Sequence, residues 1–293
     1  MRVFITGGTG LIGSAVVAEL VAAGHWVTAL TRSEASAAKA RAGGADTVRG
    51  SLADLDILSE QAGAADGVIH LAFGNDLSSP DALASNIADE TAALETLGNA
   101  LLGTGKPLVT VSGTPRADGR PSTEDDPLPA FGPVAGRSIT VDKILALADR
   151  GVRTSSIRLP RTVHNNGGGG FAGLLTQTAR QTGVAGYPGN GTQRWPAVHA
   201  LDAAALFRLA LETAPGGTAW HAVADEGDAV KDIMTVVGRR LGLPVAEVPA
   251  ENFGPLGPIF LADQPASSAR TRAESGWSPT HPSLLADLEN IRA

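Results

Sequence analysis

The feature that most constrains the fold is a run of glycines directly after the first apolar segment. Residues 2–6 (Arg-Val-Phe-Ile-Thr) have the composition of a buried strand, and Gly7, Gly10 and Gly13 follow at even spacing. Residues 11–23 then carry apolar side chains at helical spacing, so the turn joins a strand to a helix whose one apolar face comprises Leu11, Ile12, Ala15, Val16 and Leu20. A tight turn without Cβ atoms lets backbone N–H groups approach an anion, and the amino terminus of a helix adds positive potential. The pattern predicts a phosphate-binding turn in an α/β protein.

Short apolar runs alternate with Ala-rich segments of helical period over the first 160 residues. We expect strands at residues 2–6, 26–31, 47–49, 68–72, 107–112 and 154–159. We expect helices at residues 11–23, 34–42, 80–102 and 134–150. Near-continuous apolar strands separated by helices are typical of a parallel sheet covered on both faces. The predicted fold class is therefore α/β, with a doubly wound parallel sheet.

The glycine turn, the helix after it and the next strand together predict a bound dinucleotide, with its pyrophosphate at the turn. The second strand ends at Thr31, and Arg32 follows. An acidic residue there would hydrogen-bond the ribose hydroxyls of NAD, whereas Arg32 offers a cation to a 2′-phosphate. The sequence thus favours NADP over NAD. The alternative is a solvated arginine at the start of a helix.

The regular alternation stops after Pro160. Residues 165–170 read Asn-Asn-Gly-Gly-Gly-Gly, a turn cluster with little to pack. Further helices are expected at residues 171–182, 202–213 and 229–241, whereas the Pro- and Gly-rich stretch 243–282 is expected to be irregular. We predict a dinucleotide-binding domain at 1–160 and a small substrate-binding cap formed mostly by 161–293, with a soft boundary that the chain can cross again.

Composition excludes several other classes of function. The chain has no Cys, which excludes disulfides, thiolate metal sites and a Cys nucleophile. Its 23 Lys plus Arg stand against 30 Asp plus Glu, a net charge of -7 that argues against nucleic acid as a partner. No apolar run approaches the roughly 20 residues of a membrane span, and no signal peptide is visible. The six His lack metal-ligand spacing. We expect a cytoplasmic protein with a small-molecule substrate and no metal.

These segments together resemble the extended short-chain dehydrogenases/reductases, the NAD(P)-dependent epimerase/dehydratase group with a Rossmann fold. Residues 6–13 (Thr-Gly-Gly-Thr-Gly-Leu-Ile-Gly) look like its signature, and 49–54 resemble its adenine site, with Ser51 where Asp is usual. Four further segments resemble motifs of the same group, namely residues 70–72, 109–114, 158–164 and 191–202. Cofactor contacts are expected from Gly7, Thr9, Gly10, Leu11, Ile12, Gly13, Arg32, Ser51, Leu52, Leu71, Ala72, Phe73 and Pro160. Substrate contacts are expected from Arg194, Trp195 and Tyr187, with packing at a domain seam as the alternative for the first two.

The chain departs from the group's usual active site. Its members normally use a Tyr, four residues before a Lys, to move the proton that accompanies hydride transfer. The single tyrosine here, Tyr187, has Gly191 four residues later. Two alignments with the group remain open. In the first, Lys143 is the group's Lys and Ile139 stands where its Tyr would be. In the second, Ser138 stands where the Lys would be. The match is closest to an atypical subgroup that keeps the glycine turn and lacks this pair.

Four residues are candidates for stabilising and protonating the product of hydride transfer in the absence of that pair. Hydride transfer to a carbonyl leaves an alkoxide that needs stabilisation and a proton. Ser112 and Thr114 end the fifth strand and could hydrogen-bond a carbonyl, or merely cap the strand. Lys143 could bind the nicotinamide ribose, or be a solvated lysine. His164 follows the sixth strand and could donate a proton near neutral pH, or be a hydrogen-bonded loop histidine.

The sequence therefore predicts an NADP-dependent oxidoreductase acting on a small or medium carbonyl or hydroxyl compound, without the usual catalytic Tyr. An alternative is an NADP(H)-binding sensor or scaffold without turnover, similar to NmrA-like proteins. A nucleotide-sugar epimerase or dehydratase is a weaker third reading, because such reactions need strong acid–base groups beside the nicotinamide. Members of the group are often dimers, and the sequence itself shows no interface.

Overall fold

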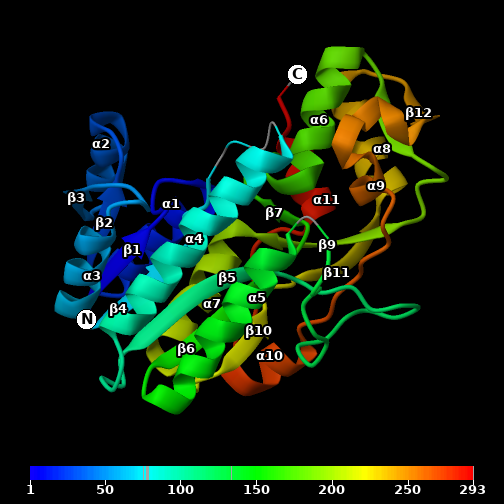
Figure 1. Cartoon of the computed structure of the whole chain (residues 1–293). Coiled ribbons are helices and arrows are strands. Elements are labelled where there is room, and N and C mark those ends of the chain that lie inside the picture. Colours follow the sequence, from blue (N-terminus) through cyan, green and yellow to red (C-terminus); the bar gives the residue numbers. More distant parts are fainter. Residues whose placement is uncertain (75, 77–78, 133, 293) are drawn as a thin grey trace. The chain divides into compact units, whose positions relative to one another are not determined.

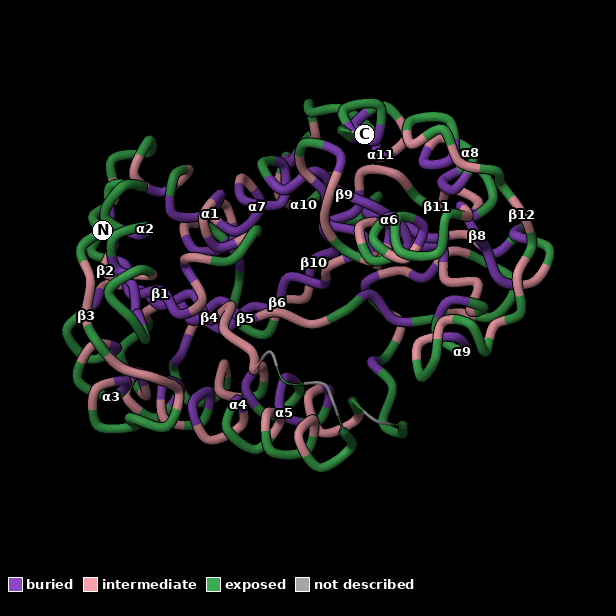
Figure 2. Tube along the Cα trace, turned by 90° about the horizontal axis from the view of Figure 1, so that it is seen from above, coloured by how far each residue is buried: buried purple, intermediate pink, exposed green. Residues whose placement is uncertain are grey.

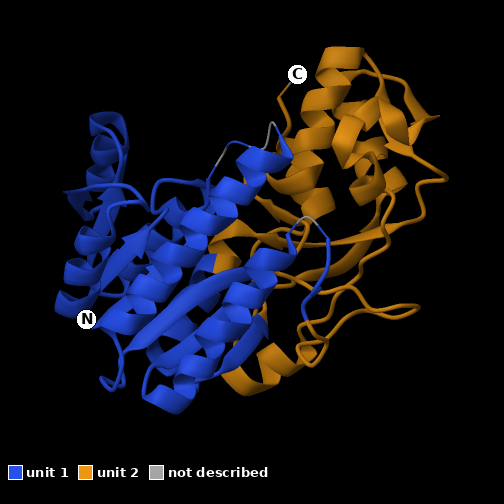
Figure 3. Cartoon of the chain, viewed as in Figure 1, with its two compact units in different colours: residues 1–112, 128–158, 204–220 blue, residues 113–127, 159–203, 221–293 orange. Residues whose placement is uncertain are grey.

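The computed structural model describes residues 1–74, 76, 79–132 and 134–292. The chain forms two compact units, shown in different colours in Figure 3. Unit 1 comprises residues 1–112, 128–158 and 204–220, and unit 2 comprises residues 113–127, 159–203 and 221–293. Each unit is thus assembled from three separate stretches of sequence.

Unit 1 is built on a seven-stranded sheet in the order β10-β6-β5-β4-β1-β2-β3. Its strands are β1 (Arg2–Thr6), β2 (Trp26–Thr31), β3 (Asp46–Arg49), β4 (Gly67–His70), β5 (Pro107–Gly113), β6 (Arg153–Leu159) and β10 (Thr218–His221). The pairs β1–β2, β1–β4, β2–β3 and β4–β5 are parallel. The predicted α/β fold with a parallel sheet is confirmed, and β1, which leads into the glycine turn, lies between β4 and β2.

Helices cover both faces of this sheet (Figure 1). They are α1 (Leu11–Ala22), α2 (Glu34–Ala42), α3 (Leu55–Ala64), α4 (Pro80–Ala100), α5 (Ala135–Leu145) with the 3-10 turn η1 (Ala146–Arg150), and α7 (Ala200–Thr213). Figure 2 shows α3, α4 and α5 on one side of the strands and α1 and α7 on the other. The sheet is therefore doubly wound, with buried side chains such as Phe4, Leu58, Leu97 and Leu108 in its core.

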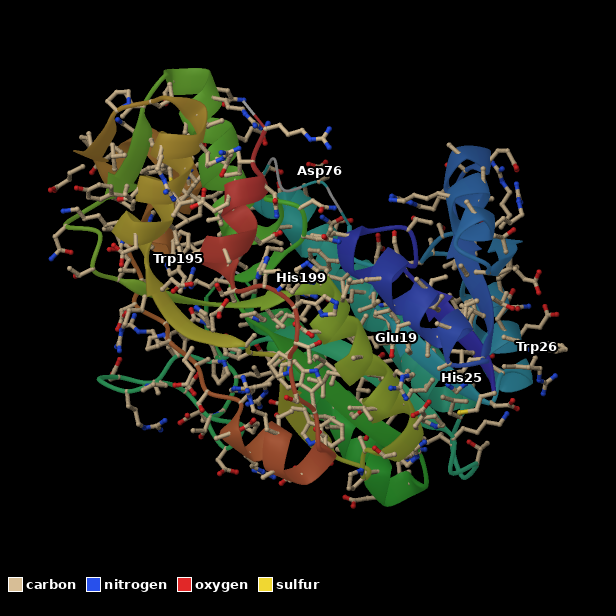
Figure 4. All side chains as sticks on the ribbon, turned by 180° about the vertical axis from the view of Figure 1, so that it is seen from behind. Glu19, His25, Trp26, Asp76, Trp195 and His199 are labelled. Carbon is tan, nitrogen blue, oxygen red and sulfur yellow. The ribbon has the colours of Figure 1, made fainter. Side chains whose placement is uncertain are left out.

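Polar contacts fix α7 to the rest of unit 1. The guanidinium of Arg153, on β6, donates to the carbonyl oxygens of Leu211 at 2.6 Å and Ala214 at 3.1 Å, where α7 ends. Arg208 pairs with Glu19 of α1 at 2.7 Å. Figure 4 labels Glu19 and, at the exit of α1, His25. These contacts satisfy the last carbonyl groups of α7 and hold the helix against α1 and β6.

Unit 2 contains two small sheets, β11-β9-β7 and β12-β8. Its strands are β7 (Thr162–His164), β8 (Ala185–Pro188), β9 (Arg194–His199), β11 (Asp225–Ala229) and β12 (Val245–Val248). Its helices are α6 (Gly170–Thr182), α8 (Val230–Leu241), α9 (Gly257–Phe260), α10 (Ala269–Ser275) and α11 (Leu284–Asp287), with the 3-10 turns η2 (Ala250–Leu256) and η3 (Leu288–Asn290). Its core gathers aromatic and aliphatic side chains around Trp195.

Two expectations about these elements are wrong. No helix is expected from the sequence at α3, and residues 243–282 are expected to be irregular, although β12, η2, α9 and α10 lie there. These elements are short, so their apolar periodicity is weak. Leu11 shares the expected apolar face of α1 with Ala15, Val16 and Leu20, yet it is 44% exposed, because it begins the helix at the glycine turn. Within the described ranges, none of the helices has the length and apolar composition needed to cross a bilayer.

Candidate functional site

The glycine turn after β1 is shaped by contacts that exclude side chains. A Cβ on Gly7, where φ is +73°, would lie 2.6 Å from the Ala72 nitrogen. A Cβ on Gly13 would lie 2.1 Å from the Gly7 oxygen, so both positions require glycine. Gly10 is the N-cap of α1 and offers no side-chain acceptor. The first backbone N–H groups of α1 therefore lack a side-chain cap and can bind an anion.

A cavity of about 650 Å³ opens above this turn, lined wholly by residues of unit 1. Its described walls are Gly7, Thr9, Gly10, Leu30, Thr31, Arg32, Ser33, Ser36, Gly50, Ser51, Leu52, Ala53, Leu71, Ala72, Phe73, Gly74, Asp76, Asn86 and Asp89. Its size suits a ligand larger than a single sugar or amino acid. Most of the expected cofactor residues line it, whereas Leu11, Ile12, Gly13 and Pro160 do not.

Strand order divides the cavity into two halves. Because β1 lies between β2 and β4, the segments after β2 and β3 flank the glycine turn on one side, and those after β4 flank it on the other. Arg32 and Ser51 belong to the first half, and Phe73 belongs to the second. In sheets of this kind a pyrophosphate lies at the turn and the adenosine ribose lies at the end of the second strand. The remaining part of a dinucleotide would then face the Phe73 half.

Arg32 is an exposed cation on the first half of the cavity wall. It forms no hydrogen bond or ion pair with any described residue. The next residue, Ser33, caps α2 by accepting a hydrogen bond from the Ser36 N–H at 3.1 Å, which fixes the backbone beside Arg32. Ser51, in the place where the family resemblance expects Asp, donates to Asp54 at 2.8 Å. That hydrogen bond and the one from the Ser51 N–H lower the pKa of Asp54.

A buried histidine fixes the exit of β4. His70 is fully buried, and its Nδ1 lies 3.0 Å from the Thr6 Oγ1, which accepts a hydrogen bond from the Ala72 N–H at 3.3 Å. Burial lowers the pKa of His70 to about 3, and the positive charge of Arg137 acts in the same direction. The ring is therefore neutral at physiological pH. The network holds the backbone that carries Ala72 and Phe73 into the cavity.

An ion pair beside this exit was not anticipated from the sequence. Arg137 of α5 contacts both carboxylate oxygens of Glu90 on α4, each at 2.7 Å, and its Cζ lies 4.1 Å from the centre of the Phe73 ring. Ten of the described cavity residues were also not among the expected cofactor contacts, and four of them carry polar side chains outside the expected segments: Ser36, Asp76, Asn86 and Asp89. Asp76, labelled in Figure 4, accepts a hydrogen bond through its carbonyl from Asn86 at 2.6 Å. The i, i+3 spacing of Asn86 and Asp89 could have shown that they share a helix face.

Two of the candidate catalytic residues lie in unit 1. The Ser112 Oγ lies 3.1 Å from the Ser156 Oγ on the neighbouring strand β6. The Lys143 side chain is 63% exposed and lies 3.8 Å from the Glu95 carboxylate on α4. Neither residue lines the cavity. Ser138, which takes the Lys place in the other alignment, is buried in α5.

The other two candidates lie in unit 2. Thr114 has a buried Oγ1 without a hydrogen-bond partner among the described residues. His164 is also buried, and its Nδ1 donates to Asp287 at 2.9 Å, while the Nε2 has no partner in the described part of the chain. Burial alone would raise the pKa of Asp287, but hydrogen bonds from His164, the Gly167 N–H and Asn290 outweigh it and lower the pKa. The contact with Asp287 fixes the orientation of the imidazole ring, and it leaves Nε2 as the nitrogen without a partner among the described residues.

The expected substrate residues also lie in unit 2. Arg194 forms a two-point pair with Asp263, with distances of 3.2 and 2.8 Å, so its guanidinium is already engaged. Trp195, labelled in Figure 4, is completely buried, and its ring packs against those of Phe171 and Phe260. Tyr187 belongs to the same core as Trp195 and is 8% exposed. No group of metal-ligating side chains occurs among the described residues.

Proteins of known sequence are similar to this chain over most of its length. A protein of Schizosaccharomyces pombe, described as uncharacterised, is 42% identical over 294 residues, which cover 98% of each chain. The UDP-glucose 4-epimerase of Corynebacterium glutamicum is 27% identical and covers 100% of this chain and 95% of its own length. The 2-alkyl-3-oxoalkanoate reductase of Stenotrophomonas maltophilia is 29% identical and covers 83% of this chain and 77% of its own.

Solved structures agree on the fold. The dTDP-glucose 4,6-dehydratase from Streptomyces venezuelae, crystallised with NAD and TYD, superposes with a TM-score of 0.80 at 19% identity, covering 99% of this chain and 95% of that one. The sequence model of the NAD dependent epimerase/dehydratase family matches residues 3–222. With its parallel sheet, glycine turn and cavity, the chain belongs to the NAD dependent epimerase/dehydratase family.

Proposed function

We propose that the protein is an NADP-dependent oxidoreductase that acts on a small or medium carbonyl or hydroxyl compound. One observation carries this proposal: a cavity of about 650 Å³ has the glycine turn at its centre and Arg32, without a partner among the described residues, on its wall. Backbone N–H groups at the start of α1 would hold the pyrophosphate. Arg32 would pair with the 2′-phosphate through its planar guanidinium.

The bound dinucleotide would supply hydride chemistry, and the protein would orient the carbonyl and provide a proton. Ser112, Thr114, Lys143 and His164 remain the proposed catalytic residues. Thr114 and His164 each carry a buried polar atom without a partner in the described chain, which supports a role for them in binding an oxygen or moving a proton. Water or the substrate itself is the alternative proton source. We further propose that the protein works in the cytoplasm.

Two other functions have specific support. A redox sensor that binds NADP(H) without turnover is favoured by the sequence around Tyr187, which has Gly191 rather than Lys four residues later. A nucleotide-sugar epimerase is favoured by the name of the Corynebacterium relative. The name of the Stenotrophomonas relative supports a carbonyl reductase instead.

The test begins with titration of the purified protein by NADPH and by NADH, followed through reduced-nicotinamide fluorescence. We expect NADPH to bind more tightly, and Arg32→Glu to weaken NADPH binding by tenfold or more while NADH binding changes little. Arg150→Glu, at an exposed arginine of η1 outside the cavity lining, is the matched control and should change neither affinity. Equal NADPH and NADH affinities in the wild-type protein would refute the NADP assignment.

A panel of carbonyl compounds, followed by reduced-nicotinamide absorbance, then separates the candidate functions. Turnover of any panel member establishes a reductase. Tight binding of NADPH without turnover of this panel or of nucleotide sugars would favour the sensor.

A further inference from the structure

The arginine near the start of α5 has no role in the function proposed so far. The Nε and Nη2 atoms of Arg137 each lie 2.7 Å from a carboxylate oxygen of Glu90. The Glu90 side chain is 4% exposed, and that of Arg137 is 28% exposed. A two-point contact with a buried carboxylate fixes the plane of a guanidinium as well as its position. Arg137 is therefore a rigidly held group on α5.

Close packing of α4 and α5 makes this contact possible. A Cβ on Gly136 would lie 2.8 Å from the Ile87 side chain, so glycine at this position lets the two helices approach. The hydroxyl groups of Thr91 and Thr140 lie 2.8 Å apart and join the same helices. Because the backbones are this close, Arg137 reaches a carboxylate in the middle of α4.

The guanidinium lies against the cavity wall. Its Cζ is 4.1 Å from the centre of the Phe73 ring, and Phe73 lines the cavity. The contact is within the range of a cation–π interaction, which fixes the ring as well as the cation. Glu90 engages Nε and Nη2, whereas Nη1 has no hydrogen bond to any described residue. The N–H groups of Nη1 therefore lie beside this wall without an acceptor among the described residues.

Phe73 belongs to the half of the cavity on the β4 side of the glycine turn. With adenosine at the end of β2, this half receives the nicotinamide and its ribose. We propose that Arg137 binds the nicotinamide-ribose half of the dinucleotide through Nη1, and that Glu90 is the positioning residue that orients it. This inference rests on the proposed function, because it requires a dinucleotide in the cavity.

The other cation of α5 is placed differently. Neither Lys143 nor Arg137 is itself among the described lining residues of the cavity, but Arg137 packs on Phe73, which is, whereas Lys143 is 63% exposed and lies 3.8 Å from Glu95. Because Glu90 neutralises much of its charge, Arg137 contributes a directed hydrogen bond rather than a general attraction for anions. A lysine could not both form the two-point contact with Glu90 and keep a donor free.

The experiment compares two probes that share the adenosine half. NADPH contains the nicotinamide, whereas 2′,5′-ADP lacks it. We expect Arg137→Gln to weaken NADPH binding by about tenfold, or about 1.4 kcal/mol, and to change 2′,5′-ADP binding less than twofold. Glu90→Gln, which keeps the shape but loses the ion pair, should weaken NADPH selectively by a smaller factor. Calorimetry or displacement of fluorescent NADPH gives both constants without any substrate.

Arg208→Gln is the matched control. Arg208 has the same 28% exposure and pairs with Glu19 and Glu212, and neither of these partners lines the cavity. It should leave both probes unchanged. Arg137→Lys is a second variant that keeps the charge should the glutamine variant fail to fold, and it should also lose NADPH affinity selectively.

Two outcomes would overturn the inference. Unchanged NADPH affinity in the folded Arg137 variants would show that the residue does not touch the dinucleotide. An equal loss for both probes would show that Arg137 only maintains the shape of the cavity. A wild-type protein that binds neither probe would refute the proposed function itself, and that result would precede any variant.

Discussion

Asp228 gives the sharpest test of the electrostatics of unit 2. It lies on β11 opposite Trp195 of β9, is partly buried, and its Oδ2 has no hydrogen-bond partner among the described residues. Burial, followed by the nearby carboxylates of Asp225 and Asp232, raises the pKa of Asp228 from its ordinary 3.8 to about 6. The folded protein therefore favours the protonated form more than the unfolded chain does.

The direction of the pH dependence follows from this. Below about pH 4 the Asp228 carboxyl is protonated and its burial adds no electrostatic cost to folding. As the pH rises through about 6 the carboxyl ionises in the folded protein, and the free energy of unfolding falls. The difference between the two pKa values corresponds to about 3 kcal/mol. Because the side chain is partly exposed, solvent screens the charge, and we expect about 1 to 2 kcal/mol.

Asp228→Asn removes the charge and keeps the shape. Urea unfolding should show the variant to be more stable than the wild-type protein by about 1 to 2 kcal/mol at pH 8, with the difference shrinking toward zero at pH 4. Glu226→Gln, at an exposed position on the same strand, is the control and should show no such trend. A stability difference between Asp228→Asn and the wild-type protein that is the same at both pH values would refute this reasoning.

Three further predictions concern the glycine turn and the candidate proton donors. Gly10→Asp should fold, because a Cβ there has its nearest neighbour 3.6 Å away, but its carboxylate should abolish NADPH binding in a fluorescence titration. Gly13→Ala should instead destabilise the fold by about 2 kcal/mol or more in thermal unfolding, because its Cβ would lie 2.1 Å from the Gly7 oxygen. Once a substrate is found, Thr114→Ala and His164→Ala should each lower kcat by about tenfold or more, equivalent to about 1.4 kcal/mol. Full activity in both variants would assign the proton to water or to the substrate.

The turn after β1 could be predicted because its requirements are local. Gly7 and Gly13 exclude side chains within a few residues of one another, and the adjacent strand and helix have clear apolar patterns. Arg32 follows directly from its place after the second strand. The cavity walls formed by these segments were therefore accessible from the sequence.

The ion pair of Arg137 with Glu90 could not be predicted in the same way. The two residues are 47 positions apart, and their contact depends on how closely α4 and α5 pack. Trp195 illustrates the converse difficulty: an aromatic side chain beside an arginine reads equally well as a ligand contact or as core, and in the structure it is completely buried. In unit 2, strands such as β7, with three residues, give too short a pattern to recognise.

The order of the segments has a consequence for how the chain is made. Unit 1 needs residues 204–220, which supply most of α7 and β10, and these emerge only after 45 residues of unit 2, 159–203. A nascent chain that ends at Leu159 has the glycine turn and the cavity walls, but β6 lacks its outer partner and Arg153 lacks the carbonyl groups of α7. Such a chain would expose a free strand edge, so we expect it to be prone to aggregate until residues 204–220 have been made. For the same reason, the cofactor unit cannot be excised as one contiguous fragment.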